Sequence, residues 1–320
     1  MTRKLPQACC PLCSKQMSSE AFRPNKKDGA RRAHSYETCL RRCESCRVAY
    51  SNQATGDTAR LTLIHACKLG NVPEDVRGHA ACVVSQALNE RNRTAKWSRF
   101  GFSTSEDALT WTVFSWLQRA GNLRQATSKA LDGLVQPLGP EPQLLLWGTP
   151  VPPATGSRGW ALRSELERVA DSLVERSDSR SEPDVILDFR ERLVFVEVKY
   201  QKSGNIDSKV PAWKYRKYTN ATTCFSDVKR MQASGCYELA RNWRLGTGLG
   251  SKAGKPFLLL NLGLPKLFKG KNGVGTSLFA GALKRSNGND FRTIIWPDFC
   301  RAIPGKPDWL QDYLALRGVS

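Results

Sequence analysis

Three charged residues stand close together in a segment, SEPDVILDFRERLVFVEVKY, that has the pattern of two β-strands. Side chains two positions apart on a strand share a face, so Glu197 and Lys199 point the same way while Val196 and Val198 point into a core. Hairpin pairing would bring Asp184, at the start of the neighbouring strand, beside Glu197. Two carboxylates placed in this way can share a hard cation such as Mg²⁺, with an ammonium group next to it.

This set of side chains suits phosphodiester hydrolysis. The reaction needs a water molecule of lowered pKa and positive charge near the nonbridging oxygens, and a carboxylate-held magnesium ion with a lysine provides both. Glu197 and Lys199 also interrupt an otherwise apolar strand, where burial is costly unless each group has a partner. A salt-bridge ladder on an edge strand is the competing interpretation, but the apolar flanks favour a central strand.

A second group of reactive side chains lies near the N-terminus. Six of the eleven cysteines fall between Cys9 and Cys46, and four of them form two CxxC pairs separated by 29 residues: Cys10, Cys13, Cys43 and Cys46. A two-residue spacer lets both sulfurs of a pair turn toward one ion, so the pairs predict a structural Zn²⁺ site resembling a zinc ribbon. Chance clustering of reduced thiols in a basic tail is the alternative.

Three nearby residues leave the ligand set open. Cys9 is an additional candidate, Cys39 could replace Cys43, and His34 could complete a set of three cysteines and one histidine. The chain has only two other histidines, His65 and His79. Because no histidine follows residue 79, serine and cysteine hydrolase mechanisms and histidine-ligated catalytic zinc are not expected in the last three quarters of the chain.

The charge balance indicates a polyanionic partner. There are 49 Lys and Arg against 29 Asp and Glu, a formal net charge of +20, and nucleic acid is the commonest partner for such a protein. Residues 201–290 hold sixteen Lys and Arg against four Asp and Glu, an excess of +12. The candidate nucleic-acid contacts are Lys214, Arg216 and Lys217, which alternate with Trp213, Tyr215 and Tyr218, together with Arg241 and Arg244.

The elements that must position these groups fall into three segments. Residues 1–55 show no sustained helical period and are expected to form the zinc ribbon-like module. Residues 56–155 are expected to form a helical region and linker, with apolar residues at three and four spacings and a capping pattern at Ser103 and Glu106. The proline-rich stretch QPLGPEPQLLLWGTPVPP predicts a connection, despite one short strand at QLLLW, and a boundary near residue 155.

Residues 156–320 alternate helical and strand patterns, which predicts an α/β domain. A helix at WALRSELERVADSLVER precedes the hairpin. A helix around FSDVKRMQASGCYELARNWR, a strand at PFLLLNLGL, a helix around TSLFAGALKR and a strand at FRTIIWPDF follow it. The glycine-rich stretch GTGLGSKAGKP, which lies between a helix and a strand, is interpreted as a flexible turn.

Pro183-Asp184, twelve residues, and then Glu197-Val198-Lys199 resemble the motif of the PD-(D/E)XK nuclease superfamily, which includes type II restriction enzymes and Holliday-junction resolvases. The resemblance implies a restriction endonuclease-like αβββαβ core, with the helix near 226–245 inserted before the third strand. It implies that Asp184 and Glu197 ligate Mg²⁺ and that Lys199 orients or activates water. It also implies that a glutamate on the first helix, matched by Glu165, supports the metal.

The periodicity of the helix places Glu165 more closely. Leu162, Leu166, Val169 and Leu173 define its buried face, and at 100° per residue Glu165 falls about 75° from the centre of that face. Glu165 is therefore expected to border both core and cleft, whereas Glu167, about 125° away, is expected to face solvent.

The sequence thus predicts a Mg²⁺-dependent nuclease with a zinc ribbon-like module, acting on DNA in microbial defence or DNA processing, and an endonuclease rather than an exonuclease. The rival expectation is a noncatalytic nucleic-acid-binding protein on a decayed nuclease scaffold. No apolar run is long enough to span a bilayer, and the chain begins without the apolar run of a secretory signal. We therefore expect a cytoplasmic protein without a membrane partner, with a homodimer left open.

Overall fold

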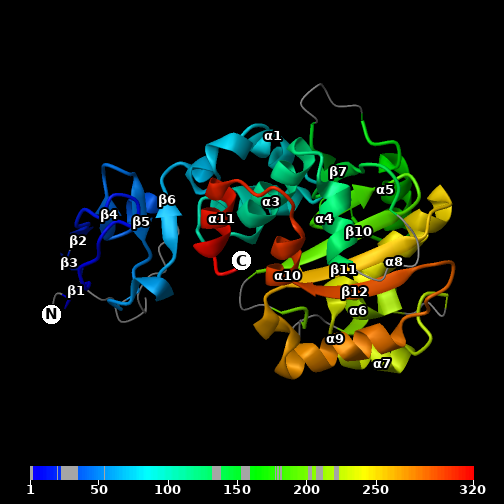
Figure 1. The fold of residues 1–320 in the computed structure, drawn as a ribbon. Helices are drawn as coiled ribbons and strands as arrows, with labels where there is room; N and C mark the ends of the chain where they lie inside the picture. The colour runs from blue at the N-terminus through cyan, green and yellow to red at the C-terminus, as the bar shows by residue number, and fades with distance from the viewer. Residues whose placement is uncertain are drawn as a thin grey trace.

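The computed structural model describes residues 3–19, 21–22, 35–53, 55–131, 138–152, 159–176, 178, 180, 182–200, 204–206, 212–219 and 223–320; nothing is described of the side chains of residues 3, 4, 21, 22 and 212–215. A six-stranded sheet with helices on both faces forms the larger part, and a small β-module lies at one end (Figure 1). The α/β class expected from the sequence is confirmed.

The N-terminal module consists of short antiparallel strands. Four of them form a sheet in the order β2-β4-β5-β6, and β1 pairs with β3. The strands are β1 (Arg3–Lys4), β2 (Ser18–Ser19), β3 (Ala21–Phe22), β4 (Arg41–Cys43), β5 (Val48–Tyr50) and β6 (Leu63–His65). Two small clusters of buried residues support this sheet, which is too little apolar surface for a stable independent core.

A group of helices follows the module: α1 (Ala80–Ser85), α2 (Glu90–Phe100), α3 (Glu106–Arg119) and α4 (Leu123–Ala130). Helix α3 is capped by Ser105, whose side chain accepts a hydrogen bond from the Ala108 backbone N–H. The expected cap at Ser103 is wrong, because the Ser103 hydroxyl accepts a hydrogen bond from the Leu63 backbone N–H of β6 instead. Glu106 is therefore free of a capping role.

The central sheet has the order β12-β11-β10-β9-β7-β8. Its strands are β7 (Gln143–Leu146), β8 (Thr149–Pro150), β9 (Val185–Asp188), β10 (Leu193–Lys199), β11 (Phe257–Gly263) and β12 (Asp290–Ile295). The expected hairpin forms, with β9 antiparallel to β10. Strands β10, β11 and β12 are parallel, because helical segments return the chain before each new strand.

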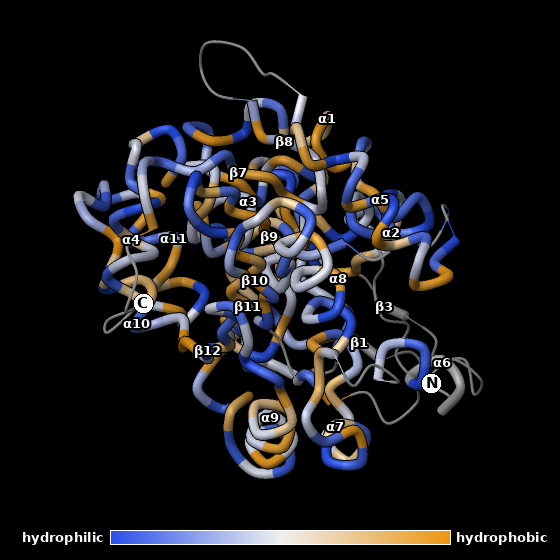
Figure 2. The backbone as a smooth tube through the Cα atoms, turned by 90° about the vertical axis from the view of Figure 1, so that its right-hand side faces the viewer, coloured by the Kyte–Doolittle hydropathy of each residue, from blue (hydrophilic) through white to orange (hydrophobic). Residues whose placement is uncertain are grey.

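Alternating side chains of β10 separate two cores. Val194, Val196 and Val198 pack into one with α1–α4, α10 (Trp296–Ala302) and α11 (Asp308–Ala315). Leu193 and Phe195 pack into the other, which is covered by the five helices α5 (Arg163–Ser172), α6 (Ala212–Thr219), α7 (Val228–Ser234), α8 (Tyr237–Ala253) and α9 (Gly270–Ala282). Figure 2 shows the hydrophobic strands in the middle of the molecule, with α7 and α9 along one side.

The expected boundary near residue 155 does not separate two cores. Strands β7 and β8 precede residue 155, yet they extend the same sheet as β9 and β10. Apolar residues of α3 and of β10 belong to one cluster. At the C-terminus, Tyr313 of α11 donates to the Ala108 carbonyl oxygen of α3, and Arg317 donates to Asn71. The helical region and the α/β region therefore fold around each other.

The glycine-rich stretch is helical rather than a turn. Helix α8 continues through it to Ala253 and ends at Gly254, which has a φ of 66°. A Cβ atom at Gly246 would lie 1.9 Å from Cζ of Phe257, so glycine lets α8 approach β11 closely.

Among the described residues, no helix has both the length and the apolar composition needed to cross a bilayer.

Candidate active site and zinc site

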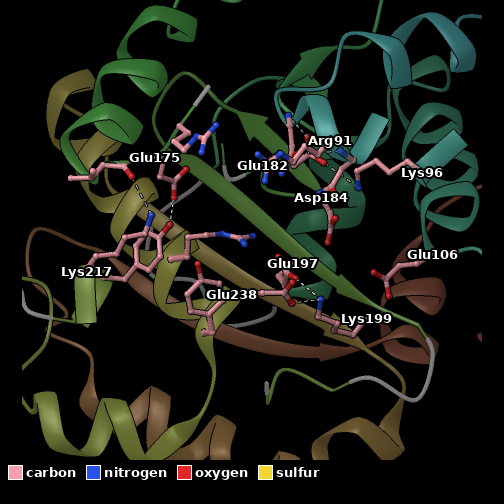
Figure 3. Close-up of a pocket in the computed structure, with 17 residues that line it drawn as sticks. Arg91, Lys96, Glu106, Glu175, Glu182, Asp184, Glu197, Lys199, Lys217 and Glu238 are labelled. Atoms are coloured by element: carbon pink, nitrogen blue, oxygen red, sulfur yellow. Dashed lines mark hydrogen bonds and ion pairs between the residues drawn. The ribbon is translucent and has the colours of Figure 1, made fainter. Parts of the chain in front are cut away.

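Asp184, Glu197 and Lys199 line one cavity of about 530 Å³. Asp184 directly precedes β9, and the last paired residues of the hairpin, Val185 and Val196, stand beside Asp184 and Glu197 in the chain. Glu197 and Lys199 lie on the same face of β10 as Phe195, under helix α8. The expected convergence of the three side chains therefore occurs, and Figure 3 shows them facing one another.

Glu197 and Lys199 form a buried ion pair. The Lys199 Nζ atom lies 2.6 Å from Oε1 of Glu197 and 2.7 Å from Oε2 of Glu238 on α8. Asn242, also on α8, donates to Oε2 of Glu197 at 2.7 Å. Only 3% of Glu197 and 8% of Lys199 is exposed. Both groups are thus held by protein partners at the base of the cavity.

Asp184 keeps one carboxylate oxygen available. Its Oδ2 atom accepts a hydrogen bond of 2.9 Å from the Val198 backbone N–H, which fixes the side chain against β10. Oδ1 has no hydrogen-bond partner among the described residues, and the side chain faces the cavity. An incoming cation would find this oxygen free.

Two acidic residues that sequence reasoning missed complete the group. Glu106 of α3 lines the cavity and accepts a hydrogen bond of 2.7 Å from the Tyr200 backbone N–H, one residue beyond β10. Glu182 also lines it and accepts from the Asn89 backbone N–H at 2.9 Å. Glu182 stands two residues before Asp184, a proximity that was available in the sequence. The sequence pattern predicts a capping role for Glu106, and that interpretation gives no reason to expect Glu106 in the cavity.

The helical region also supplies a lysine. Lys96 of α2 lies 2.9 Å from Asp107 and 3.3 Å from Glu182, over the Trp147 ring. Burial opposes the charge of Lys96, but the nearby carboxylates, including Asp184, outweigh it and raise the pKa of the ammonium group. Lys96 thus stays charged beside Asp184. No spacing pattern in the sequence connects α2 with the hairpin.

Burial dominates the acid–base properties of the carboxylates. It raises the pKa of Asp184 to about 7, that of Glu106 to about 7 and that of Glu197 to about 8, although Lys199 acts in the opposite direction on each of them. The pKa of Lys199 is raised, because Glu197 and Glu238 outweigh the effect of burial. Carboxyl groups that hold protons near neutral pH gain from a cation that replaces those protons.

The carboxylates of the cavity offer oxygen atoms of the kind that could bind a divalent cation such as Mg²⁺. Carboxylate oxygens are the ligands this ion prefers, and it usually takes one or two carboxylates together with water and substrate phosphates. Within the described residues, six acidic and six basic side chains line the cavity, so its formal charge is zero when all are ionised. A divalent cation would add the positive charge that a phosphodiester needs. Asp184 and Glu197 could each contribute a carboxylate ligand, but among the described residues no three carboxylates bring their oxygens within 4.8 Å of one another.

Glu165 does not line the cavity, contrary to expectation. It pairs with Arg168 on the surface of α5 at 2.5 Å, while Glu167 pairs with Arg163 at 2.7 Å. The cavity is lined by Val174 and Glu175, which follow the C-terminal end of α5 at Ser172, whereas Glu165 lies in the first turn of this helix. Periodicity gave the face of Glu165 but not its position along the axis, so it was placed at the wrong end of the helix.

The candidate nucleic-acid contacts are distributed over different surfaces. Lys217 and Arg241 line the same cavity as Asp184, whereas Arg244 lines a second cavity, of about 650 Å³, beside the end of α8. Arg216 is exposed on α6, and the side chain of Lys214 lies outside the described part of the chain. Tyr218 is only 1% exposed, so it is not available to stack on bases as expected.

The four paired cysteines converge as predicted. The Sγ atoms of Cys10, Cys13, Cys43 and Cys46 all lie within 4.8 Å of one another. The Sγ atoms of Cys13 and Cys43 are 3.7 Å apart, close to the separation of roughly 3.8 Å that tetrahedral geometry gives at a Zn–S distance of about 2.3 Å. The cluster could therefore hold a metal such as zinc.

The open alternatives for this site are now resolved in part. Cys39 is fully buried in another small cluster, where its thiol donates to the Ser35 carbonyl oxygen. Cys9 is exposed and is not a member of the four-sulfur group. His34 lies outside the described residues.

No family model, curated protein or solved structure matches this chain.

Proposed function

We propose that this protein is a Mg²⁺-dependent nuclease that hydrolyses phosphodiester bonds in DNA. The observation that carries the proposal is the convergence of Asp184, Glu197 and Lys199, from a PD and an ExK segment on neighbouring strands, in a single cavity. Their burial argues against a solvent-exposed salt-bridge ladder, since buried charges of this kind are costly and gather mainly at functional sites.

The order of elements supports a restriction endonuclease-like core. The expected helix, three strands, helix and strand correspond to α5, β9, β10, β11, α9 and β12, with α6–α8 inserted. A second assignment starts from α3 and uses β7, β9, β10, α8 and β11. In this assignment the three strands β7, β9 and β10 are neighbours in the sheet, each antiparallel to the next. Glu106 then lies on the first helix and faces the cavity. We favour the second assignment, in which Glu106 takes the role first assigned to Glu165.

Each side chain has a distinct role in the proposed reaction. Asp184 and Glu197 would hold Mg²⁺, which, when bound, lowers the pKa of a coordinated water and neutralises phosphate charge. Lys199 would exchange its carboxylate partners for a nonbridging phosphate oxygen and stabilise the charge that develops there. Glu238 and Asn242 keep Lys199 and Glu197 oriented before substrate arrives. The zinc site would stabilise the N-terminal module.

The test is a cleavage assay on plasmid and linear DNA with Mg²⁺ or EDTA. Asp184→Asn, Glu197→Gln and Lys199→Met should each lower the rate by at least about a hundredfold, the scale of losing a metal ligand or a charge-stabilising group. Glu106→Gln should lower it clearly as well. DNA binding should persist in all four variants, because affinity rests mainly on the basic surface.

Glu165→Gln is the matched control, since it changes a glutamate that the structure places outside the cavity. It should cleave at the wild-type rate. Wild-type activity in both Asp184→Asn and Glu197→Gln would refute the nuclease. Binding without cleavage by the wild-type protein under any divalent ion would instead favour a noncatalytic DNA-binding protein.

A further inference from the structure

The mouth of the cavity carries an exposed apolar residue in an unfavourable backbone conformation. Val174 lines the cavity, is 81% exposed and has a φ of 56°. This left-handed region suits glycine, and a β-branched residue is an outlier there. Outliers of this kind persist where the surrounding structure enforces them, which is most often at functional sites.

The local structure explains how the conformation is enforced. Val174 follows the end of α5, where its N–H donates to the Asp171 carbonyl oxygen at 2.8 Å and the Glu175 N–H donates to that of Ala170 at 3.1 Å. This bond pair closes a helix with a left-handed residue that is usually glycine. Glu175 is buried and accepts a hydrogen bond from the Tyr218 hydroxyl. The loop is thus anchored from below while Val174 projects into solvent.

Positively charged side chains line the same cavity as this valine. Arg91 and Arg176 line the same cavity and have side-chain exposures of 62% and 76%, with Asp178 between them as a common partner. Lys217 donates to the Val174 carbonyl oxygen at 3.5 Å. An apolar side chain among exposed cations matches a nucleic-acid strand, whose phosphates attract the cations and whose bases accept apolar contact.

The depth of the cavity restricts how such a strand can enter. Glu197 and Lys199 lie at its base, almost fully buried. A cavity of about 530 Å³ falls in the range of small-molecule pockets, so it can admit a nucleotide rather than a stacked duplex. A phosphodiester would reach the carboxylates only on a strand that has left the base stack.

We infer that Val174 is an apolar wedge that separates a strand from its duplex, and that the substrate is DNA with unpaired nucleotides beside a duplex end or junction. This inference rests on the proposed nuclease function and names its substrate class. Arg91, Arg176 and Lys217 would hold the phosphates that flank the unstacked base.

The first experiment uses the full-length Glu197→Gln protein, so that cleavage does not intervene. The probe is a duplex with a single-stranded extension and 2-aminopurine at the junction, because this base gains fluorescence when it unstacks. Protein binding should raise the fluorescence several-fold. Adding Val174→Ala or Val174→Gly should remove most of the gain, whereas Val274→Ala, at an exposed valine of α9, should leave it intact.

The two substitutions separate side chain from backbone. Both remove the wedge, but only Val174→Gly relieves the left-handed conformation, so it alone should raise the Tm. An unchanged fluorescence gain in both variants would overturn the inference. A loss seen only with glycine would overturn it too, because loop conformation would then be responsible.

Cleavage then distinguishes this inference from the proposed function. With Glu197 intact, the protein should cleave the extended duplex at least about tenfold faster than a continuous one, a preference worth about 1.4 kcal/mol, and Val174→Ala should abolish the preference. Cleavage without any dependence on Val174 would refute the wedge and leave the nuclease. A Val174-dependent fluorescence gain without cleavage would refute the nuclease and leave the wedge.

Discussion

Three carboxyl groups of the cavity are held in a state that favours protons. Burial raises the pKa of Asp184 and Glu106 to about 7 and that of Glu197 to about 8, whereas unfolded carboxyl groups titrate near 4. Between pH 4 and 8 these three groups therefore bind more protons in the folded protein than in the unfolded chain. These groups destabilise the metal-free protein progressively as the pH rises through this range.

We expect the stabilisation by Mg²⁺ to have the opposite dependence. The ion needs ionised carboxylates, so it must displace protons at pH 6 but few at pH 8.5. At about a hundredfold excess over its Kd at high pH, Mg²⁺ should stabilise the folded protein by about 2.7 kcal/mol, and the same concentration should stabilise it much less at pH 6. Thermal unfolding with and without Mg²⁺ at both pH values measures it.

Glu197→Gln tests the origin of this dependence, because glutamine keeps the side-chain size but cannot ionise. Its Mg²⁺-dependent rise in Tm should be small at both pH values. A rise in the variant that equals the wild-type rise would place the ion elsewhere.

At the residue scale, sequence reasoning identified the hairpin triad but not its partners. Asp184, Glu197 and Lys199 share a short segment whose strand alternation fixes their faces. Glu106, Lys96 and Glu238 come from helices far away in the chain, and only tertiary packing brings them to the cavity. Glu165 was misplaced because helical periodicity defines an angle around the axis and not the height at which a helix crosses a sheet.

At the scale of elements, the approach of α8 to β11 depends on glycine. Gly246→Ala should destabilise the protein by about 1–3 kcal/mol, the usual cost of overpacking, because the new Cβ atom would overlap the Phe257 ring. Urea unfolding measures the change. Gly78→Ala is the control, since no atom lies within 4 Å of a Cβ atom there. Equal stabilities of the two variants would show that α8 packs less closely than described.

The four-sulfur cluster makes a second prediction at this scale. Cys13→Ser should abolish binding of the zinc ion and unfold the small sheet of β2, β4, β5 and β6, because the apolar clusters beneath it are too small to maintain it. Metal analysis and thiol alkylation of the native protein measure both effects. Cys9→Ser, at an exposed position outside the cluster, should bind as much zinc as the wild type.

The elements themselves were predicted with uneven success. The strands at 185–188, 193–199, 257–263 and 290–295 follow apolar runs and were expected. The sequence predicts a short strand at β7 but places it in a linker, since prolines dominate its surroundings and no local signal reveals a pairing with β9. The glycine-rich end of α8 was called a turn because propensity favours one, and close packing on Phe257 overrides that preference.

For the whole molecule, the common core predicts that the chain cannot be divided at the expected boundary. A fragment of residues 156–320 would lack β7 and α1–α4, leaving the apolar face formed by Val194, Val196 and Val198 uncovered. It should be insoluble or unfolded by circular dichroism. Residues 56–320 keep both cores and should unfold cooperatively. A folded fragment of residues 156–320 would contradict this prediction and support a domain boundary near residue 155.

The contact of α11 with α3 also has a consequence for biosynthesis. The Tyr313 hydroxyl forms hydrogen bonds with Thr112 and with the Ala108 carbonyl oxygen, and Arg317 donates to Asn71. These hydrogen bonds cannot form until α11 and Arg317 have been synthesised. Chains emerge from the ribosome N-terminus first, and incomplete cores stay open. Residues 313–317, which are translated long after α3, thus close the region that holds Glu106. A nascent chain carrying a strongly basic sequence would lie beside ribosomal RNA with its cavity unassembled, so the proposed activity would begin only after α11 has been translated and has packed on α3.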